Sequence, residues 1–469
     1  MGGDPRRRPG GAARGRRPLP AGRRRRGGRL VPAPRRRGGW PVRPPAADAA
    51  PPRLIYRVRR VAGAPIVAAR AWLRGGARLE RIPGQAVVCG RLLAEGSRRR
   101  DYRRIARQAE DRGMAVESFG SYESIGASID ALAGDWQLAL DWLAELVLEP
   151  AFPAGRFTWM RRQVAAELDS LLDQGDLRTA YGFAEQLYHP HPYGRPLHGT
   201  ADDLARLTAE DCPAFHARAL AHGLVVVVTG EIDEEAVGRR IEALFADLEP
   251  AQRAVPLPAV PAPAGRSPAR RRVDLPAGDQ AHFYAGHLTI PRNHPDRPAL
   301  DLLAVALGAG GGLGGRLSTL IREQQGLAYS VDVATAAGAG LDPGRLVVYA
   351  ATDAEHLERL EALVGDELRR LVEDGLSEAE IEEARSYLLG SHPFRRETAR
   401  QWADRLADAV FYDLPDAGGR WCLERWQRLD RRAVDDAARL WIKPGELRLT
   451  TGLPAGTPGA PPSRREAPG

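Results

Sequence analysis

Residues 310–333 read GGGLGGRLSTLIREQQGLAYSVDV, and no other stretch of the chain is as informative. Five glycines lead into apolar residues at i, i+3 and i+4, which predicts a short helix through Leu317, Leu320 and Ile321. Gly326 suits the position that directly follows a helix end. Alternation then predicts a strand whose two sides are formed by Leu327, Tyr329, Val331 and Val333 and by Ala328, Ser330 and Asp332.

Two polar side chains flank the predicted helix-to-strand turn. Arg322 and Tyr329 stand seven residues apart. Both donate hydrogen bonds, and the arginine is always charged. They form either a functional pair of donors or an ordinary surface arginine beside a tyrosine that packs on its strand.

The composition predicts a globular chain with tails. Its 469 residues suffice for two or three domains, and 43% of them are hydrophobic. The net charge is +8, but residues 1–50 hold fifteen Arg and two Asp, so the remainder carries about −5 (8 minus 13). We expect residues 1–52 and 456–469 to be disordered. The arginine-rich tail is either a solvated extension or, as a third functional possibility, a contact for nucleic acid.

The same composition suggests a compartment. The abundance of arginine over lysine is typical of a GC-rich bacterial genome. No apolar run is long enough to span a membrane, and the charged N-terminus is a poor secretory signal because no apolar run of 7–15 residues follows it. Cys89, Cys212 and Cys422 lack close spacing, which argues against a disulfide framework and suits a reducing compartment. We therefore expect a cytoplasmic protein, or a periplasmic one if translation starts downstream of Met1.

The chain reads as a duplication. Residues 53–249 predict strands at 53–75, 116–132 and 224–228 and helices at 84–95, 98–112, 136–148, 153–172, 201–206, 208–221 and 234–247. A proline-rich linker is predicted at 250–272. Residues 273–455 then predict strands at 280–287, 345–351 and 447–450 and helices at 298–307, 354–373, 378–391 and 431–440. Because a strand ending in Thr-Gly closes both halves, we predict two tandem homologous α+β domains, each a mostly antiparallel sheet with helices on one face.

Residues 310–333 resemble the second-domain signature of the insulinase/pitrilysin family of zinc metallopeptidases. In that family a glycine-rich turn leads into a helix, an arginine and, seven residues later, a tyrosine. The resemblance covers roughly residues 53–455, since the family also has tandem α+β domains joined by a linker. It implies that Arg322 and Tyr329 bind the substrate's carbonyl oxygen near a zinc site in another domain.

The zinc motif of that family, H-x-x-E-H, is replaced in this chain. The resemblance aligns its two histidines and its general-base glutamate with Val87, Arg91 and Gly90, and its third ligand with Glu167, 76 residues beyond Arg91. Valine has no donor atom, arginine keeps its proton, and glycine cannot transfer one. We therefore assign no metal and no cofactor to this chain. We predict an Arg91–Glu167 salt bridge at the zinc position, the alternative being that Arg91 reaches into solvent.

Other candidate sites have weaker support. His189, His191 and His198 lie in a Pro/Gly-rich loop and could ligate a metal, but a surface loop explains them equally. Gly310, Gly312 and Gly315 fit the spacing of a dinucleotide-binding fingerprint but follow a predicted helix instead of a strand. Cys89 is either a core residue or a catalytic thiol. Motifs of the types H-E-x-x-H, G-x-S-x-G and G-x-x-x-x-G-K-[ST] do not occur.

The resemblance implies a specific role. Some family members are heterodimers in which one subunit carries the zinc and a similar, zinc-less subunit supplies the Arg/Tyr pair. This chain looks like the second kind, inactive alone and working with a homologous partner that carries H-x-x-E-H and zinc. The alternative is a purely structural homologue without a catalytic role.

Overall fold

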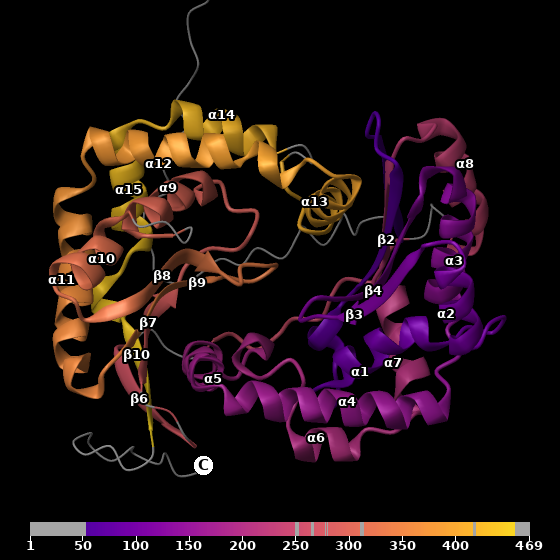
Figure 1. The fold of residues 1–469 in the computed structure, drawn as a ribbon, viewed down its shortest axis with the longest axis horizontal. Coiled ribbons are helices and arrows are strands. Elements are labelled where there is room, and N and C mark those ends of the chain that lie inside the picture. The colour runs from indigo at the N-terminus through magenta and orange to yellow at the C-terminus, as the bar shows by residue number, and fades with distance from the viewer. Residues whose placement is uncertain are drawn as a thin grey trace, which may run out of the picture. The chain divides into compact units, whose positions relative to one another are not determined.

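The computed structural model describes residues 53–248, 253–263, 267–276, 278, 280–309, 314–415 and 419–454. The predicted tails at 1–52 and 456–469 and the glycines at 310–312 lie outside the described residues. Within the described part, the chain forms two α+β halves, each with a five-stranded sheet (Figure 1). No helix in that part is both long enough and apolar enough to cross a membrane.

The first half follows the predicted order of elements except for one additional helix, α5. Its strands are β1 (Leu54–Arg60), β2 (Ile66–Arg74), β3 (Ala115–Gly120), β4 (Ser124–Leu132) and β5 (Leu224–Gly230). Its helices are α1 (Gln85–Arg91), α2 (Tyr102–Glu110), α3 (Trp136–Leu148), α4 (Ala154–Asp173), α5 (Gly175–Tyr188), α6 (Ala201–Arg206), α7 (Asp211–Ala221) and α8 (Glu234–Leu244). Side chains of Asp101, Thr200 and Asp233 accept backbone N–H groups at the starts of α2, α6 and α8, which explains where these helices begin.

The second half repeats the plan. Its strands are β6 (Ala269–Leu275), β7 (Ala281–Leu288), β8 (Ala328–Ala337), β9 (Arg345–Thr352) and β10 (Arg448–Pro454). Its helices are α9 (Arg297–Leu307), α10 (Arg316–Ser318), α11 (Leu357–Asp374), α12 (Glu378–Ser391), α13 (Ala399–Phe411), α14 (Arg420–Arg428) and α15 (Arg431–Trp441). α12 and α13 both begin with capping boxes, formed by Ser377 with Glu380 and by Thr398 with Gln401.

The strand order confirms the duplication. The first sheet runs β1-β5-β2-β4-β3 and the second β6-β10-β7-β9-β8, so corresponding strands occupy the same places. β1 pairs with β5 and β6 with β10 in parallel, and the other neighbours are antiparallel. The sheets are therefore mostly antiparallel, as predicted, and β3 and β8 form corresponding edges.

Each half also contributes one helix to the sheet of the other. α5 packs against β6, β7 and β10, and α13 packs against β2 and β5 (Figure 1). In β5, Val226 and Val228 join the core of the first half, whereas Val225 and Val227 pack with residues of α13. This arrangement explains why the strand is apolar on both faces.

The hydrophobic pattern does not predict α5, α13 or α14. The faces that α5 and α13 bury mix large side chains with small ones, among the small ones Gly182 in α5 and Ala403 and Ala407 in α13. A Cβ on Gly182 would lie 2.6 Å from Val273 Cγ2, so the glycine permits the close approach of α5 to β6. Small side chains produce weak hydrophobic periodicity, and the pattern therefore carries little signal.

Two predictions need correction. β6 begins at Ala269, inside the predicted linker 250–272. The strand was missed because its sequence is rich in arginine, which is tolerated since β6 is an edge strand paired only with β10. Cys89 of α1 and Cys212 of α7 form a disulfide, with their Cα atoms 5.1 Å apart. The two cysteines are 123 residues apart in sequence, and they meet only because α1 packs on α7.

Candidate functional site

The segment 314–337 forms the predicted helix, turn and strand. α10 continues into a π-helical turn over Thr319–Gln324, and Leu317 and Ile321 are buried in the core of the second half. Gly326 follows with a φ of 64°, a backbone conformation that favours glycine. β8 then begins at Ala328. π-helical turns are rare and frequently occur at functional sites.

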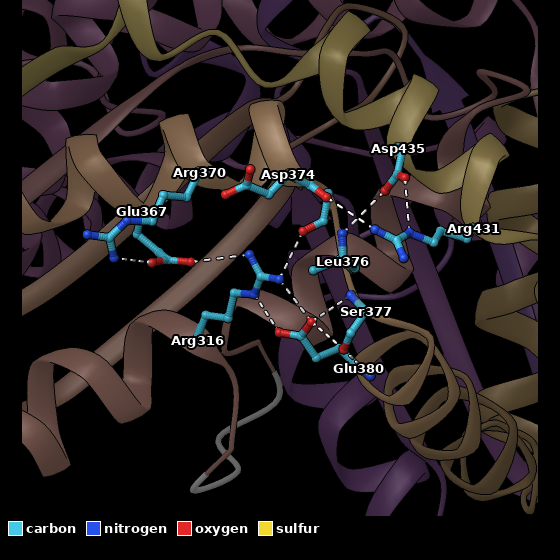
Figure 2. A network of polar contacts seen from close by, with 10 residues as sticks. Arg316, Glu367, Arg370, Asp374, Leu376, Ser377, Glu380, Arg431 and Asp435 are labelled. Carbon is cyan, nitrogen blue, oxygen red and sulfur yellow. Dashed lines mark hydrogen bonds and ion pairs between the residues drawn. The ribbon is translucent and has the colours of Figure 1, made fainter.

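Arg316 anchors the start of this segment to α11 and α12 (Figure 2). Its guanidinium donates to Glu380 Oε2 and to the backbone oxygen of Gly375, both at 2.9 Å, and to Glu367 Oε1 at 3.4 Å. The hydrogen-bonded Arg316 guanidinium lowers the pKa of Glu380 to about 2. The ion pair is therefore fully charged at neutral pH and holds the helix that carries Arg322.

The position of Tyr329 corrects the predicted alternation. Ala328 pairs with Thr352 and Ser330 pairs with Ala351, so Tyr329 is the extra residue of a β-bulge. Its side chain is 79% exposed instead of sharing the buried side of Val333. The bulge interrupts the two-residue period that the sequence suggested.

Arg322 and Tyr329 lie together. The guanidinium carbon of Arg322 stands over the Tyr329 ring, 4.8 Å from its centroid, which is a cation–π contact. Among the described residues, no carboxylate lies within 4 Å of the Arg322 guanidinium nitrogens. The guanidinium N–H groups and the phenol O–H are therefore available to an acceptor, and the tyrosine is not packed into its strand.

A second group of predicted residues lies between α1 and α4. Arg91 donates from Nη1 to Glu167 Oε2 at 2.5 Å and from Nη2 to Glu167 Oε1 at 3.1 Å, so the predicted salt bridge is confirmed and is bidentate. His198 Nε2 lies 3.4 Å from Glu167 Oε1. The hydrogen bond from Arg91 is the largest cause of the lowered pKa of Glu167. Both side chains of the pair are partly exposed.

The residues at these positions do not fit zinc. Val87 is buried and apolar, and Arg91 is already bound to the only carboxylate of the four positions. A Cβ on Gly90 would lie 2.4 Å from the backbone oxygen of Phe119 in β3, so a longer side chain has no room there. Throughout the described residues, no group of three or more His, Cys, Asp and Glu side chains gathers in a way that could hold a metal ion.

The three histidines of the loop have separate surroundings. His191 is buried, and its Nε2 lies 3.1 Å from Asp342 Oδ2 of the second half. Its Nδ1 accepts the backbone N–H of Tyr193 at 3.1 Å. His198 faces Glu167, whereas His189 is exposed. The structure therefore offers no common ligand position for them.

Glu80 is a buried acidic residue beside α1 that no sequence motif indicates. It accepts the backbone N–H of Ala86 at 2.8 Å and pairs with Arg195 Nη2 at 2.6 Å. Burial raises the pKa of Glu80 to about 7, against the opposing effect of Arg195. The sequence could not have identified Glu80, because a single glutamate before an apolar run is too common to predict a buried acidic residue.

The comparisons with known proteins agree with this architecture. The family model of insulinase (peptidase family M16) matches residues 59–201, and that of the peptidase M16 inactive domain matches residues 206–388. An uncharacterized zinc protease of Mycobacterium tuberculosis is 31% identical over 325 residues, 68% of this chain and 73% of that protein. A non-peptidase homolog of Helicobacter pylori is 24% identical over 369 residues, 77% of this chain and 83% of that protein.

A solved structure shares the fold. The crystal structure of a peptidase M16 inactive domain from Pseudomonas fluorescens has a TM-score of 0.76 at 24% identity, and the match covers 86% of this chain and 95% of that one. The two halves are thus tandem peptidase-like domains of the insulinase type. The chain belongs to peptidase family M16, as the resemblance of residues 310–333 predicted.

Proposed function

We propose that the chain is the zinc-less subunit of a two-subunit M16 peptidase, in which Arg322 and Tyr329 bind the substrate of a zinc-bearing partner. The observation that carries this proposal is the contact of the half-buried Arg322 with the exposed Tyr329, whose donors have no carboxylate partner among the described residues. We interpret the positions between α1 and α4 as a degenerate zinc site, because a bidentate ion pair occupies them. The chain is therefore expected to be inactive alone.

The pair has the chemistry to bind a peptide carbonyl. When a nucleophile attacks a peptide bond, negative charge develops on the carbonyl oxygen, and a guanidinium and a phenol can both donate to it. Such donors act best when they are fixed beforehand. The Arg316 contacts with α11 and α12 supply this rigidity at the start of the segment. The zinc chemistry itself belongs to the partner.

The names of the relatives support both parts of the proposal. The Mycobacterium tuberculosis relative is called a zinc protease, and the Helicobacter pylori relative a non-peptidase homolog. A member of this family can thus keep the fold without the activity, which is the condition that a zinc-less subunit requires.

A reconstituted pair tests the proposal. We would purify this chain with a homologue from the same organism that carries H-x-x-E-H and measure kcat and KM on fluorogenic peptides. Arg322→Ala and Tyr329→Phe are each expected to lower kcat by about 10²–10³-fold without preventing complex formation. Arg432→Ala, a substitution of an exposed arginine elsewhere in the second half, is expected to leave kcat unchanged.

Two results would contradict the proposal. Full cleavage activity with both Arg322→Ala and Tyr329→Phe would favour the structural homologue, in which the stacked pair only stabilises its turn. Stoichiometric zinc in the purified chain, measured by mass spectrometry, would show that the first half retains a metal site that its described residues do not form.

A further inference from the structure

α1 is a short helix that depends on its surroundings. It spans seven residues, and Gly84 at its start provides no side-chain cap. Isolated helices of this length are not stable in water. Gln85 Nε2 donates to the backbone oxygen of Asp211 at 3.1 Å, and Arg91 is held by Glu167. Contacts with α7 on one side and α4 on the other therefore fix the helix.

The contact with α7 is covalent. Cys89 lies two residues before Arg91, and Cys212 lies in the first turn of α7. Their Cα separation of 5.1 Å is within the normal range for disulfides, and their side chains are 1% and 0% exposed. The folded positions of α1 and α7 therefore suit the closed bond.

We propose that the Cys89–Cys212 disulfide is a redox-dependent clamp that joins α1 covalently to α7 in the oxidised protein and strengthens the contacts that hold α1 and Arg91. The bond forms by thiol–disulfide exchange with a small-molecule or protein disulfide. One cysteine thiolate attacks that disulfide, which forms a mixed disulfide and releases one donor thiolate. The other cysteine thiolate then attacks the protein sulfur of the mixed disulfide and releases the second donor thiolate. The two thiols lose two protons and two electrons, and the donor disulfide is reduced to two thiols.

The burial of both sulfurs determines when exchange can occur. A disulfide donor cannot reach them in the folded chain, so the clamp closes during folding or when α1 opens locally. Once closed, it is protected from reductants by the same burial. Such a bond persists in an oxidising compartment and is rare where cellular thiols remain reduced. The proposal therefore predicts an oxidising compartment for the working protein, in contrast to the expectation from cysteine spacing.

Thiol counting tests the clamp directly. The full chain, isolated from acid-quenched producing cells, would be denatured and labelled with maleimide-polyethylene glycol with and without reduction. We expect one labelled cysteine, Cys422, before reduction and three after it. Peptide mapping should join the peptides that contain Cys89 and Cys212. Three labelled cysteines before reduction would overturn the proposal.

Thermal unfolding tests whether the bond holds the fold. Refolding from denaturant in the presence of a reductant keeps the bond open and is expected to lower the Tm of the wild type and of Cys422→Ser by about 2–6 °C. The Cys89→Ser/Cys212→Ser variant should begin at the lower Tm and not respond to the reductant. An equal Tm with and without the disulfide would show that the bond does not clamp α1. If the double variant does not fold, the comparison of the wild type with and without reductant decides the same question.

Discussion

Two glycines set the distance between α1 and β3. A Cβ on Gly90 would lie 2.4 Å from Phe119 O, and one on Gly120 would lie 2.0 Å from Ala86 O. The obstructing atoms belong to the backbone, so they cannot rotate aside. Substituting Val87→His, Gly90→Glu and Arg91→His would restore the H-x-x-E-H pattern, but the glutamate would have to displace the edge strand.

A single methyl group tests this close approach. Gly90→Ala is expected to lower the free energy of unfolding by about 1–3 kcal/mol, because the added methyl overpacks the α1–β3 contact. The control is Gly155→Ala in α4, where an added Cβ meets no atom within 4 Å. That substitution should be neutral or stabilise the protein by up to about 1 kcal/mol, since alanine favours a helix. Urea denaturation of both variants measures the difference, and equal stabilities would contradict the prediction.

Glu80 gives the first half a specific pH dependence. Burial raises its pKa from 4.5 to about 7 in the folded chain, so its contribution to stability is full below pH 4.5 and is lost as the pH rises towards 7. Relative to Glu80→Gln, the wild type should lose at most about 1.4 kcal/mol per pH unit in this window. Urea unfolding at pH 5, 6, 7 and 8 measures the difference. A difference that grows in favour of the wild type with rising pH would contradict the sign.

At the level of elements, the sequence predicts those whose signals are local. α12 is found with both ends correct because Ser377 and Glu380 form a capping box and large apolar residues recur behind them. α5 and α13 are not predicted, because small residues between the large buried ones weaken their hydrophobic period. The sequence does not predict the bulge at Tyr329 either, because a bulge is defined by the pairing of β8 with β9 and not by the sequence of β8 alone.

In the candidate site, too, some contacts could be predicted from the sequence and others could not. The Arg91–Glu167 contact could be predicted because the alignment with a known motif fixed both positions. The stacking of Arg322 on Tyr329 could not be predicted, because it requires the bulge that turns the tyrosine outward. The Cys89–Cys212 disulfide could not be predicted either, since no local sequence rule relates two positions that are 123 residues apart.

At the scale of the whole molecule, buried contacts join the two halves. The backbone N–H of Leu341, in the loop between β8 and β9, donates to Glu123 Oε1 at 2.9 Å. The phenol of Tyr188 donates to the backbone oxygen of Pro343 at 3.0 Å. Together with the exchanged helices α5 and α13, these contacts make the halves depend on each other for stability.

Phe411 of α13 tests this dependence. It is fully buried and packs with Val225 and Val227 of the first sheet. Phe411→Ala is expected to lower the free energy of unfolding by about 3–5 kcal/mol. In calorimetry both halves should lose stability together, whereas Phe394→Ala, at an exposed position, should have little effect. A shift confined to one of two separate transitions would show that the halves are independent.

The exchange of helices also affects how the protein is synthesised. The ribosome completes β5 long before α13, since Thr229 and its hydrogen-bonding partner Ala399 are 170 residues apart. At typical elongation rates, the face of the first sheet that packs on α13 stays uncovered for roughly 10–30 s after β5 is made. During this interval Val225 and Val227 are open to chaperones and to neighbouring nascent chains. The first half is therefore translated first but completes its fold only after α13 of the second half has been made.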